Sequence, residues 1–156
     1  THRHSGSYSA SAVGEVNVVN EMKRTNAIIG GEGNGGVIVP DLHYGRDALA
    51  GVAIFLSLLA EKGMSMTELK ATYPTYVIIK DKLELTPALD LDLIFANIKE
   101  TFKNEKLNDI DGLKIDFAEG WVHMRKSNTE PIVRIYCEAK DDNTAQSLIQ
   151  KVKAII

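Results

Sequence analysis

The segment RKSNTEPIVRIYCEA, residues 125–139, joins a polar loop to a strand. After Pro131 apolar and polar side chains alternate, and this period of two residues predicts a strand with one face in a core. Cys137 alternates with Val133 and Ile135, so we expect it to be a buried packing residue and not a nucleophile. The polar residues before the strand then form the turn between two strands of a half-buried sheet.

The rest of residues 75–156 carries the same half-buried pattern. Apolar residues alternate in YVIIKDKLEL and in GLKIDF, which predicts two further strands, and WVHMR predicts another after a turn at Glu119 and Gly120. One helix is predicted at about residues 90–103 and a last helix from about Asn143, each with an apolar face. The predicted order is β-α-β-β-β-α, an α+β domain of the TBP-like kind with an antiparallel sheet and its helices on one face.

Residues 1–74 show a different sequence pattern, which predicts part of a mixed α/β domain. NAIIGGEGNGGVIVP is typical of a strand, a glycine-rich loop and a second strand, with the paired isoleucines in the first strand. A helix is predicted at residues 46–62, where apolar residues recur at helical spacing. Ser65 and Glu68 form a capping-box pattern for a short helix, and residues 73–78 are the expected linker.

Composition limits the class of protein. The chain has 156 residues and a net charge of −3, and its basic loop has no stacking aromatics, so nucleic acid is not an expected partner. The single cysteine excludes an intramolecular disulfide framework and fits a reducing compartment. The longest apolar run, AGVAIFLSLLA, is too short for a membrane span, and the N-terminal residues lack the apolar region of a signal peptide. We therefore expect a cytoplasmic protein without a membrane partner.

Two loops carry side chains suited to binding. Arg125 offers a planar fork of donors for phosphate or carboxylate, and the hydroxyls and amide of residues 127–129 add further donors. The glycine-rich loop GGEGNGG, residues 30–36, holds Glu32 and Asn34, whose carboxylate and amide suit the hydroxyls of a sugar. From residue types alone, a polar hairpin tip and a polar turn remain open as simpler explanations.

The first loop resembles the phosphate-binding loop of the α-D-phosphohexomutases, the phosphoglucomutase/phosphomannomutase superfamily. The family pattern is Arg-x-Ser-Asn-Thr-x-Pro, followed by another Arg and by Glu-Ala. This sequence matches the pattern at Arg125, Ser127, Asn128, Thr129, Pro131, Arg134 and Glu138. The resemblance implies that the phosphate of the substrate is bound by Arg125, Ser127, Asn128, Thr129 and Arg134.

The glycine-rich loop resembles the sugar-binding loop Gly-Glu-x-Ser/Asn-Gly of the same family. The neighbouring segments AVGEVNVV and HYGRDAL resemble its archaeal-type branch. The resemblance implies that Glu32 and Asn34 bind ring hydroxyls and that Glu15 approaches the sugar. It covers essentially the whole chain, with residues 1–74 as the end of the third domain and residues 75–156 as the fourth domain.

Members of this family resemble one another in a four-domain plan, in which a phosphoserine transfers the phosphoryl group and an Asp-Gly-Asp loop holds Mg²⁺. This chain shows neither motif. Its serines lack the Ser-His-Asn-Pro context of the phosphoserine, Asp90 and Asp92 are expected to begin a helix, and Asp109-x-Asp111-Gly112 is expected to form a turn before a strand. The resemblance implies the C-terminal part of an enzyme that interconverts hexose 1-phosphate and hexose 6-phosphate through a bisphosphate. Mg²⁺ and the N-terminal domains would lie outside this chain, which would have no metal site and would be inactive alone.

Two other functions stay open. Phosphoglucosamine mutase is a related activity, although its bacterial form usually shows Ser and His in the sugar loop where this chain has Asn34 and Gly36. A phosphosugar-binding module without catalysis is the second alternative, and upstream serine and aspartate motifs in the encoding gene would exclude it.

Overall fold

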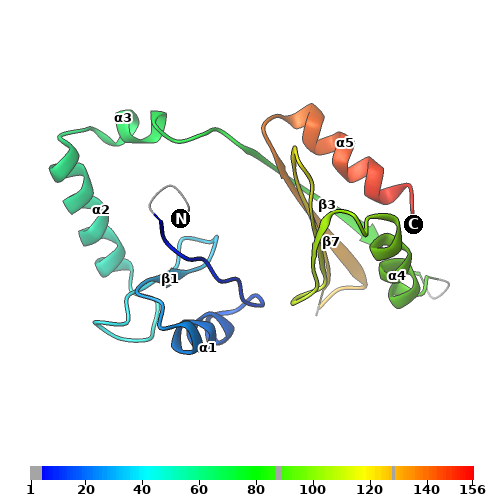
Figure 1. Cartoon of the computed structure of the whole chain (residues 1–156), viewed down its shortest axis with the longest axis horizontal. Helices are drawn as coiled ribbons and strands as arrows, with labels where there is room; N and C mark the ends of the chain where they lie inside the picture. Colours follow the sequence, from blue (N-terminus) through cyan, green and yellow to red (C-terminus); the bar gives the residue numbers. More distant parts are fainter. Residues whose placement is uncertain (1–4, 87–88, 128) are drawn as a thin grey trace. The chain divides into compact units, whose positions relative to one another are not determined.

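The structure, a computed structural model, describes residues 5–86, 89–127 and 129–156 (Figure 1). The chain divides into two compact units, Thr1–Tyr73 and Pro74–Ile156. Within the described residues, no helix is both long enough and apolar enough to cross a membrane.

The second unit is built on one five-stranded antiparallel sheet. Along this sheet the strand order is β3-β7-β6-β5-β4, so the last strand in the sequence lies beside the first. Helices α4 and α5 accompany the sheet (Figure 1). The bounds are β3 Val77–Glu84, α4 Leu91–Thr101, β4 Lys106–Asn108, β5 Leu113–Asp116, β6 Gly120–Lys126, β7 Ile132–Ala139 and α5 Asp142–Lys153.

Both helices pack on the same face of the sheet. Alternate residues of β5, β6 and β7 are buried there and join the apolar faces of α4 and α5 in one core. The core includes Ile94, Ile98, Phe102, Leu113, Ile115, Phe117, Val122, Met124, Val133, Ile135, Leu148, Ile149 and Val152. Because side chains alternate across a strand, the residues in between lie on the opposite, open face of the sheet. The predicted antiparallel sheet with helices on one face is confirmed.

Cys137 lies in this core, as its alternation with apolar residues predicts. Its side chain is fully buried, and this burial, together with the charge of the neighbouring Glu138, raises the pKa of the thiol to about 11. The thiolate is the reactive form of cysteine, so a thiol that stays protonated at neutral pH is a packing group. The prediction that Cys137 is not a nucleophile agrees with this environment.

Three details differ from the sequence expectations. The structure adds the short strand β4, so the order is β-α-β-β-β-β-α. The expected linker, residues 73–78, overlaps β3, because Val77 and Ile78 pair with Ala139 and Glu138 of β7. Ile28 and Ile29 are exposed and precede the first strand, which consists of the glycines that follow them.

The first unit contains α1, α2, α3 and a small antiparallel hairpin of β1 and β2. The bounds are α1 Glu15–Thr25, β1 Gly30–Gly31, β2 Val37–Ile38, α2 Ala48–Lys62 and α3 Met66–Ala71. Its buried apolar residues are Met22, Ile38, Ala50 and Leu69. Helix α2 is apolar on several sides, with Leu49, Val52, Ile54 and Leu56 exposed. A helix of this composition is normally buried, so α2 carries a surface suited to cover by other protein.

Two predicted helix starts are confirmed, one in each unit. Ser65 and Glu68 form a complete capping box at the start of α3, in which each side chain satisfies a backbone N–H of the other residue. The carboxylate of Asp90 accepts hydrogen bonds from the backbone N–H groups of Asp92 and Leu93 at the start of α4. These caps satisfy donors that the first turn of a helix leaves without partners.

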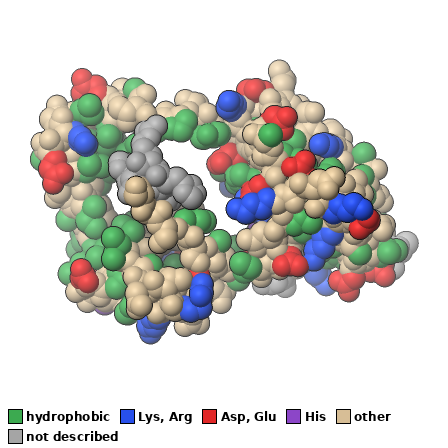
Figure 2. All heavy atoms as spheres, viewed as in Figure 1, with side chains coloured by type: hydrophobic (Ala, Val, Ile, Leu, Met, Phe, Trp, Pro, Cys, Tyr) green, Lys and Arg blue, Asp and Glu red, His purple; other side chains and the backbone are tan. Residues whose placement is uncertain are grey.

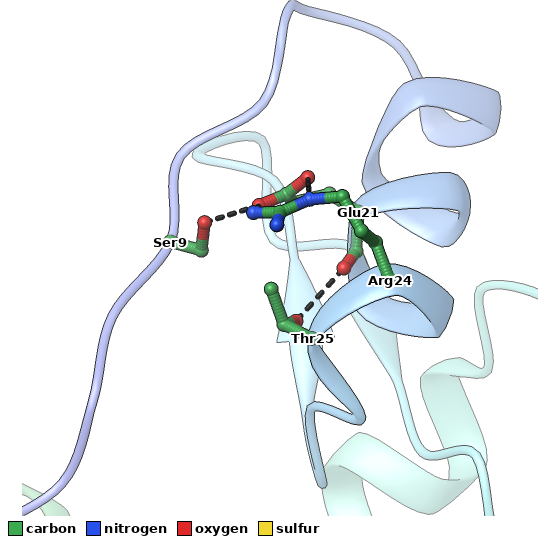
Figure 3. Close-up of polar contacts among 4 residues, drawn as sticks. All are labelled: Ser9, Glu21, Arg24 and Thr25. Carbon is green, nitrogen blue, oxygen red and sulfur yellow. Dashed lines mark hydrogen bonds and ion pairs between the residues drawn. The ribbon is translucent and has the colours of Figure 1, made fainter.

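The N-terminal segment is tied to α1 through Glu21 (Figure 3). Ser9 Oγ donates a hydrogen bond to Glu21 Oε1, and Arg24 donates from Nε to Oε2 at 2.8 Å and from Nη2 to Oε1 at 2.6 Å. Thr25 Oγ1 donates to the backbone oxygen of Glu21 at 2.8 Å. The Arg24 guanidinium, followed by the Ser9 hydroxyl, lowers the pKa of Glu21 to about 2.

We expect Glu21 to contribute to the loss of stability of the first unit at acidic pH. Because its pKa falls from 4.5 to about 2 on folding, its contribution is complete above about pH 4.5 and is lost as the pH falls toward 2. The variant Glu21→Gln lacks this carboxylate. The stability of the first unit, followed through the amide NMR signals of α1 during acid unfolding, should therefore depend less steeply on pH. Glu61→Gln, which removes an exposed carboxylate of α2, should keep the wild-type slope. A Glu21→Gln slope equal to wild type would contradict the assignment.

Candidate functional site

The loop between β6 and β7 is organised around the hydroxyl of Ser127. Ser127 is only 5% exposed, and among the described residues no other polar side chain is buried. The Ser127 N–H donates to Ile132 O at 2.9 Å, which closes the loop. Ser127 Oγ accepts long contacts from Thr129 N at 3.4 Å and from Arg134 Nη2 at 3.5 Å, and lies 3.5 Å from Thr129 Oγ1. Several donors therefore converge on one small region.

Strand register places three cations in one row on the open face of the sheet. Lys82 of β3 lies directly opposite Arg134 of β7, which lies directly opposite Arg125 of β6. Directly opposite residues have Cβ atoms about 5 Å apart, and like charges so placed repel one another. This cation row (Lys82, Arg134 and Arg125) is therefore stabilised by negative charge from neighbouring carboxylates or from a bound anion.

Each member of the cation row also contacts a carboxylate. The pairs are Arg125 Nη1 with Asp111 Oδ2 at 3.2 Å, Arg134 Nη2 with Glu130 Oε2 at 3.1 Å and Lys82 Nζ with Glu84 Oε1 at 3.1 Å. Figure 2 shows such mixing of basic and acidic side chains on the surface of the second unit. Ion pairs at a protein surface contribute little to stability, and each cation has further N–H donors, so a doubly charged phosphate can bind to the same cations.

The structure brings most of the predicted phosphate-binding residues together. Arg125 and Arg134 lie opposite each other, and Ser127 and Thr129 lie in the loop that joins their strands. Asn128, the remaining predicted member, lies outside the described residues.

The glycine-rich loop forms a tight hairpin between β1 and β2. The Glu32 N–H donates to Gly36 O at 3.0 Å, and the Gly35 N–H donates to Glu32 O at 3.1 Å. Asn34 Oδ1 accepts a hydrogen bond from the Gly36 N–H at 3.0 Å, so the carbonyl end of this amide helps to shape the turn. Gly35 has φ of +93°, a conformation that favours glycine.

Arg46 connects the two carboxylates that were predicted to approach a sugar. Its Nε donates to Glu15 Oε2 at 2.9 Å and its backbone N–H donates to Glu15 Oε1 at 3.1 Å. Its Nη1 lies 3.8 Å from Glu32 Oε2. Glu15 and Glu32, far apart in the sequence, thus share one guanidinium. We did not predict this role for Arg46, and its position just before α2 in HYGRDAL was the available signal.

The start of α2 is fixed beside this cluster by Asp47. Its carboxylate accepts a hydrogen bond from Ala50 N at 2.9 Å and lies 3.1 Å from His43 Nε2. The backbone N–H of Ala50, followed by the His43 ring, lowers the pKa of Asp47. These contacts hold the segment that carries Arg46, because Arg46 is the residue directly before this cap.

A metal site is not formed by the part of the chain that the structure describes. There, no three His, Cys, Asp or Glu side chains gather in a way that could hold a metal ion. Asp90 caps α4, and Asp111 pairs with Arg125. The two loops present guanidinium, hydroxyl, carboxylate and amide groups, which suit the binding of an anion and of hydroxyl groups.

Two domains of one protein family match the chain. Residues 1–76 match the alpha/beta/alpha domain III of the family described as Phosphoglucomutase/phosphomannomutase, and residues 77–155 match its C-terminal domain.

Individual relatives agree with this match. A phosphoglucosamine/phosphogalactosamine mutase of Sulfurisphaera tokodaii is 38% identical over 92% of this chain, and a phosphoglucomutase/phosphomannomutase of Thermococcus kodakarensis is 38% identical over 88% of it. The matches cover 32% and 30% of those proteins, so this chain spans about a third of their length.

A solved structure supports the same relationship. A phosphoglucomutase/phosphomannomutase family protein from Burkholderia thailandensis is 25% identical and superposes with a TM-score of 0.72 over 92% of this chain and 31% of that one. The fold, both domain matches and the named relatives therefore agree with the resemblance read from the two loops. The chain belongs to the phosphoglucomutase/phosphomannomutase family, of which it carries residues of domain III and the C-terminal domain.

Proposed function

We propose that this chain is the phosphosugar-binding C-terminal part of a phosphohexomutase. The whole protein would be an isomerase that moves a phosphoryl group within a hexose phosphate, between positions 1 and 6, through a bisphosphate intermediate. The observation that carries the proposal is the cation row beside the nearly buried hydroxyl of Ser127. Residues 1–74 would supply the sugar-binding loop and residues 75–156 the phosphate-binding loop. A cytoplasmic location stays a prediction.

The loop after β6 would bind the phosphate that does not react. Arg125 and Arg134 supply positive charge, and Ser127 and Thr129 supply hydroxyl donors that already converge in the loop. By resemblance, Asn128 completes this set. A phosphate fixed in this way positions the far end of the sugar for phosphoryl transfer, which depends chiefly on positioning and on charge stabilisation.

The glycine-rich loop would orient the sugar ring. The Glu32 carboxylate supplies acceptors for hydroxyl groups, and the amide nitrogen of Asn34 supplies donors. Glu15 would contribute through its shared contact with Arg46, which holds both carboxylates in place.

Mg²⁺ would be held by residues outside this chain. Among the described residues the carboxylates do not gather into a metal site. Asp90 caps α4, Asp109 pairs with Lys99 and Asp111 pairs with Arg125. By resemblance, we assign substrate binding, and no chemical step, to the residues of this chain. Phosphoryl transfer would require the remaining domains of the protein.

A titration followed by amide NMR tests the proposal. Inorganic phosphate, glucose 1-phosphate and mannose 1-phosphate should each shift the signals around residues 125–130, and only the sugar phosphates should also shift those around Glu32. The variant Glu32→Gln should weaken binding of both sugar phosphates by about threefold to tenfold, because one hydroxyl acceptor is impaired. Binding of inorganic phosphate should stay unchanged, which makes it the internal control. Absence of shifts near residue 125 with every phosphate would overturn the proposal.

A second candidate, phosphoglucosamine mutase, is favoured by the names of several relatives. The Sulfurisphaera tokodaii relative is named phosphoglucosamine/phosphogalactosamine mutase, and a relative from Methanopyrus kandleri that is 32% identical is named probable phosphoglucosamine mutase. A carboxylate such as Glu32 also suits the ammonium group of an amino sugar. Tighter binding of glucosamine 6-phosphate than of glucose 6-phosphate, with the difference lost in Glu32→Gln, would select this activity.

A further inference from the structure

Asp111 lies in a turn that is pressed against β6. The next residue, Gly112, has φ of +77°, a conformation that L side chains rarely adopt. A Cβ atom at Gly112 would lie 2.2 Å from Met124 O and 3.0 Å from Arg125 Cα. Only glycine allows the turn to approach the strand this closely, and the approach occurs directly beside Arg125.

Two side chains of β6 hold Asp111 from the open face of the sheet. His123 Nε2 lies 2.6 Å from the backbone oxygen of Asp111, and Arg125 Nη1 lies 3.2 Å from its Oδ2. The side chains of Arg125 and Asp111 are 27% and 28% exposed, so both are largely shielded from solvent. The backbone and the carboxylate of Asp111 are therefore both placed with respect to Arg125.

We propose that Asp111 is a positioning residue of the phosphate site, which holds the Arg125 guanidinium in the orientation that binds phosphate. This inference rests on the proposed function, because it requires Arg125 to bind the phosphate. A long arginine side chain loses conformational freedom when it binds a ligand, and a carboxylate partner that restrains it in advance reduces this loss. The same geometry assigns His123 and Gly112 to holding Asp111 in place.

The direction in which a substitution of Asp111 changes phosphate affinity distinguishes a positioning role from simple electrostatic repulsion. Asp111 places a negative charge beside an anion site, so simple Coulomb repulsion predicts that Asp111→Asn binds phosphate more tightly. Positioning predicts the opposite result, because the neutral amide restrains the guanidinium less well. Asp116→Asn is the matched control, since Asp116 lies on the same sheet and pairs with Lys114 instead of Arg125.

The experiment measures the dissociation constant of inorganic phosphate by NMR titration of the 156-residue chain. We expect Asp111→Asn to raise this constant about fivefold, within the range of coupling between contacting residues, and Asp116→Asn to leave it unchanged. Asp111→Glu, which keeps the carboxylate, should restore part of the affinity. In an Arg125→Ala background, Asp111→Asn should have no further effect, because the residue acts through Arg125. The amide spectrum of each variant checks that the sheet is intact.

The outcomes separate the two proposals. If Arg125→Ala weakens binding but Asp111→Asn leaves it unchanged or tightens it, the positioning role is overturned while the phosphate site stands. If Asp111→Asn weakens binding equally with and without Arg125, Asp111 does not act through that residue and the inference is also wrong. If Arg125→Ala has no effect on binding, the phosphate site itself is overturned, and the role of Asp111 with it.

Discussion

Arg125→Ala is expected to weaken the binding of inorganic phosphate and hexose phosphates by at least about tenfold. A hydrogen bond to a charged group contributes about 1.5–3 kcal/mol, and 1.4 kcal/mol corresponds to a factor of ten. The free energy of unfolding should not fall in parallel, because the loss of the ion pair with Asp111 is offset by the removal of one of two like charges that lie directly opposite each other on β6 and β7. Loss of affinity without loss of stability is the behaviour of a binding residue.

Lys126→Ala is the matched control for this substitution. Lys126 is the next residue of β6 and carries the same charge, but it pairs with the core residue Val133 and not with Arg134. It should therefore leave phosphate affinity close to wild type. In the full-length protein, the proposed mutase activity predicts that Arg125→Ala lowers substrate binding and kcat/KM together. An unchanged kcat/KM, or an equal loss of phosphate affinity in the two variants, would contradict the assignment of Arg125 to phosphate binding.

Ile98→Ala is expected to lower the free energy of unfolding of the second unit by about 3–4 kcal/mol. Ile98 is 0% exposed and lies on the face of α4 that packs against the sheet. Removal of three buried carbon atoms loses their transfer free energy and leaves a cavity, which together cost about 2–5 kcal/mol for such a residue. Urea unfolding can be followed by the fluorescence of Trp121, which is the one tryptophan of the chain and lies on β6.

Leu93→Ala on the same helix is the comparison for Ile98→Ala. Leu93 is 58% exposed, so its truncation removes little buried area and should cost well below about 1 kcal/mol. Both variants change helix propensity in the same direction, so the difference between them reports the core. Equal destabilisation by the two substitutions would show that α4 does not pack on the sheet as described.

Strong periodicity is what made much of the second unit predictable. In β3, β5 and β7 the two-residue alternation of apolar side chains matches their burial, and Ile94 and Ile98 recur at the spacing of a helix face. The strand β4 escaped prediction because three residues are too few to show a period. It exists as a strand because it pairs with β5.

The local motif at residues 125–131 indicated, without any structure, the family, which the domain matches confirm, and the residue types of the predicted phosphate site. Local sequence could do this because a loop that binds phosphate needs particular donors at fixed spacing. The tertiary structure alone decided which other side chains lie beside the predicted phosphate-binding residues. The register of β3 against β7 placed Lys82 in the cation row, and the turn before β5 brought the Asp111 carboxylate into contact with the Arg125 guanidinium. These contacts join residues far apart in the sequence, and strand pairing sets them in a way that no local pattern records.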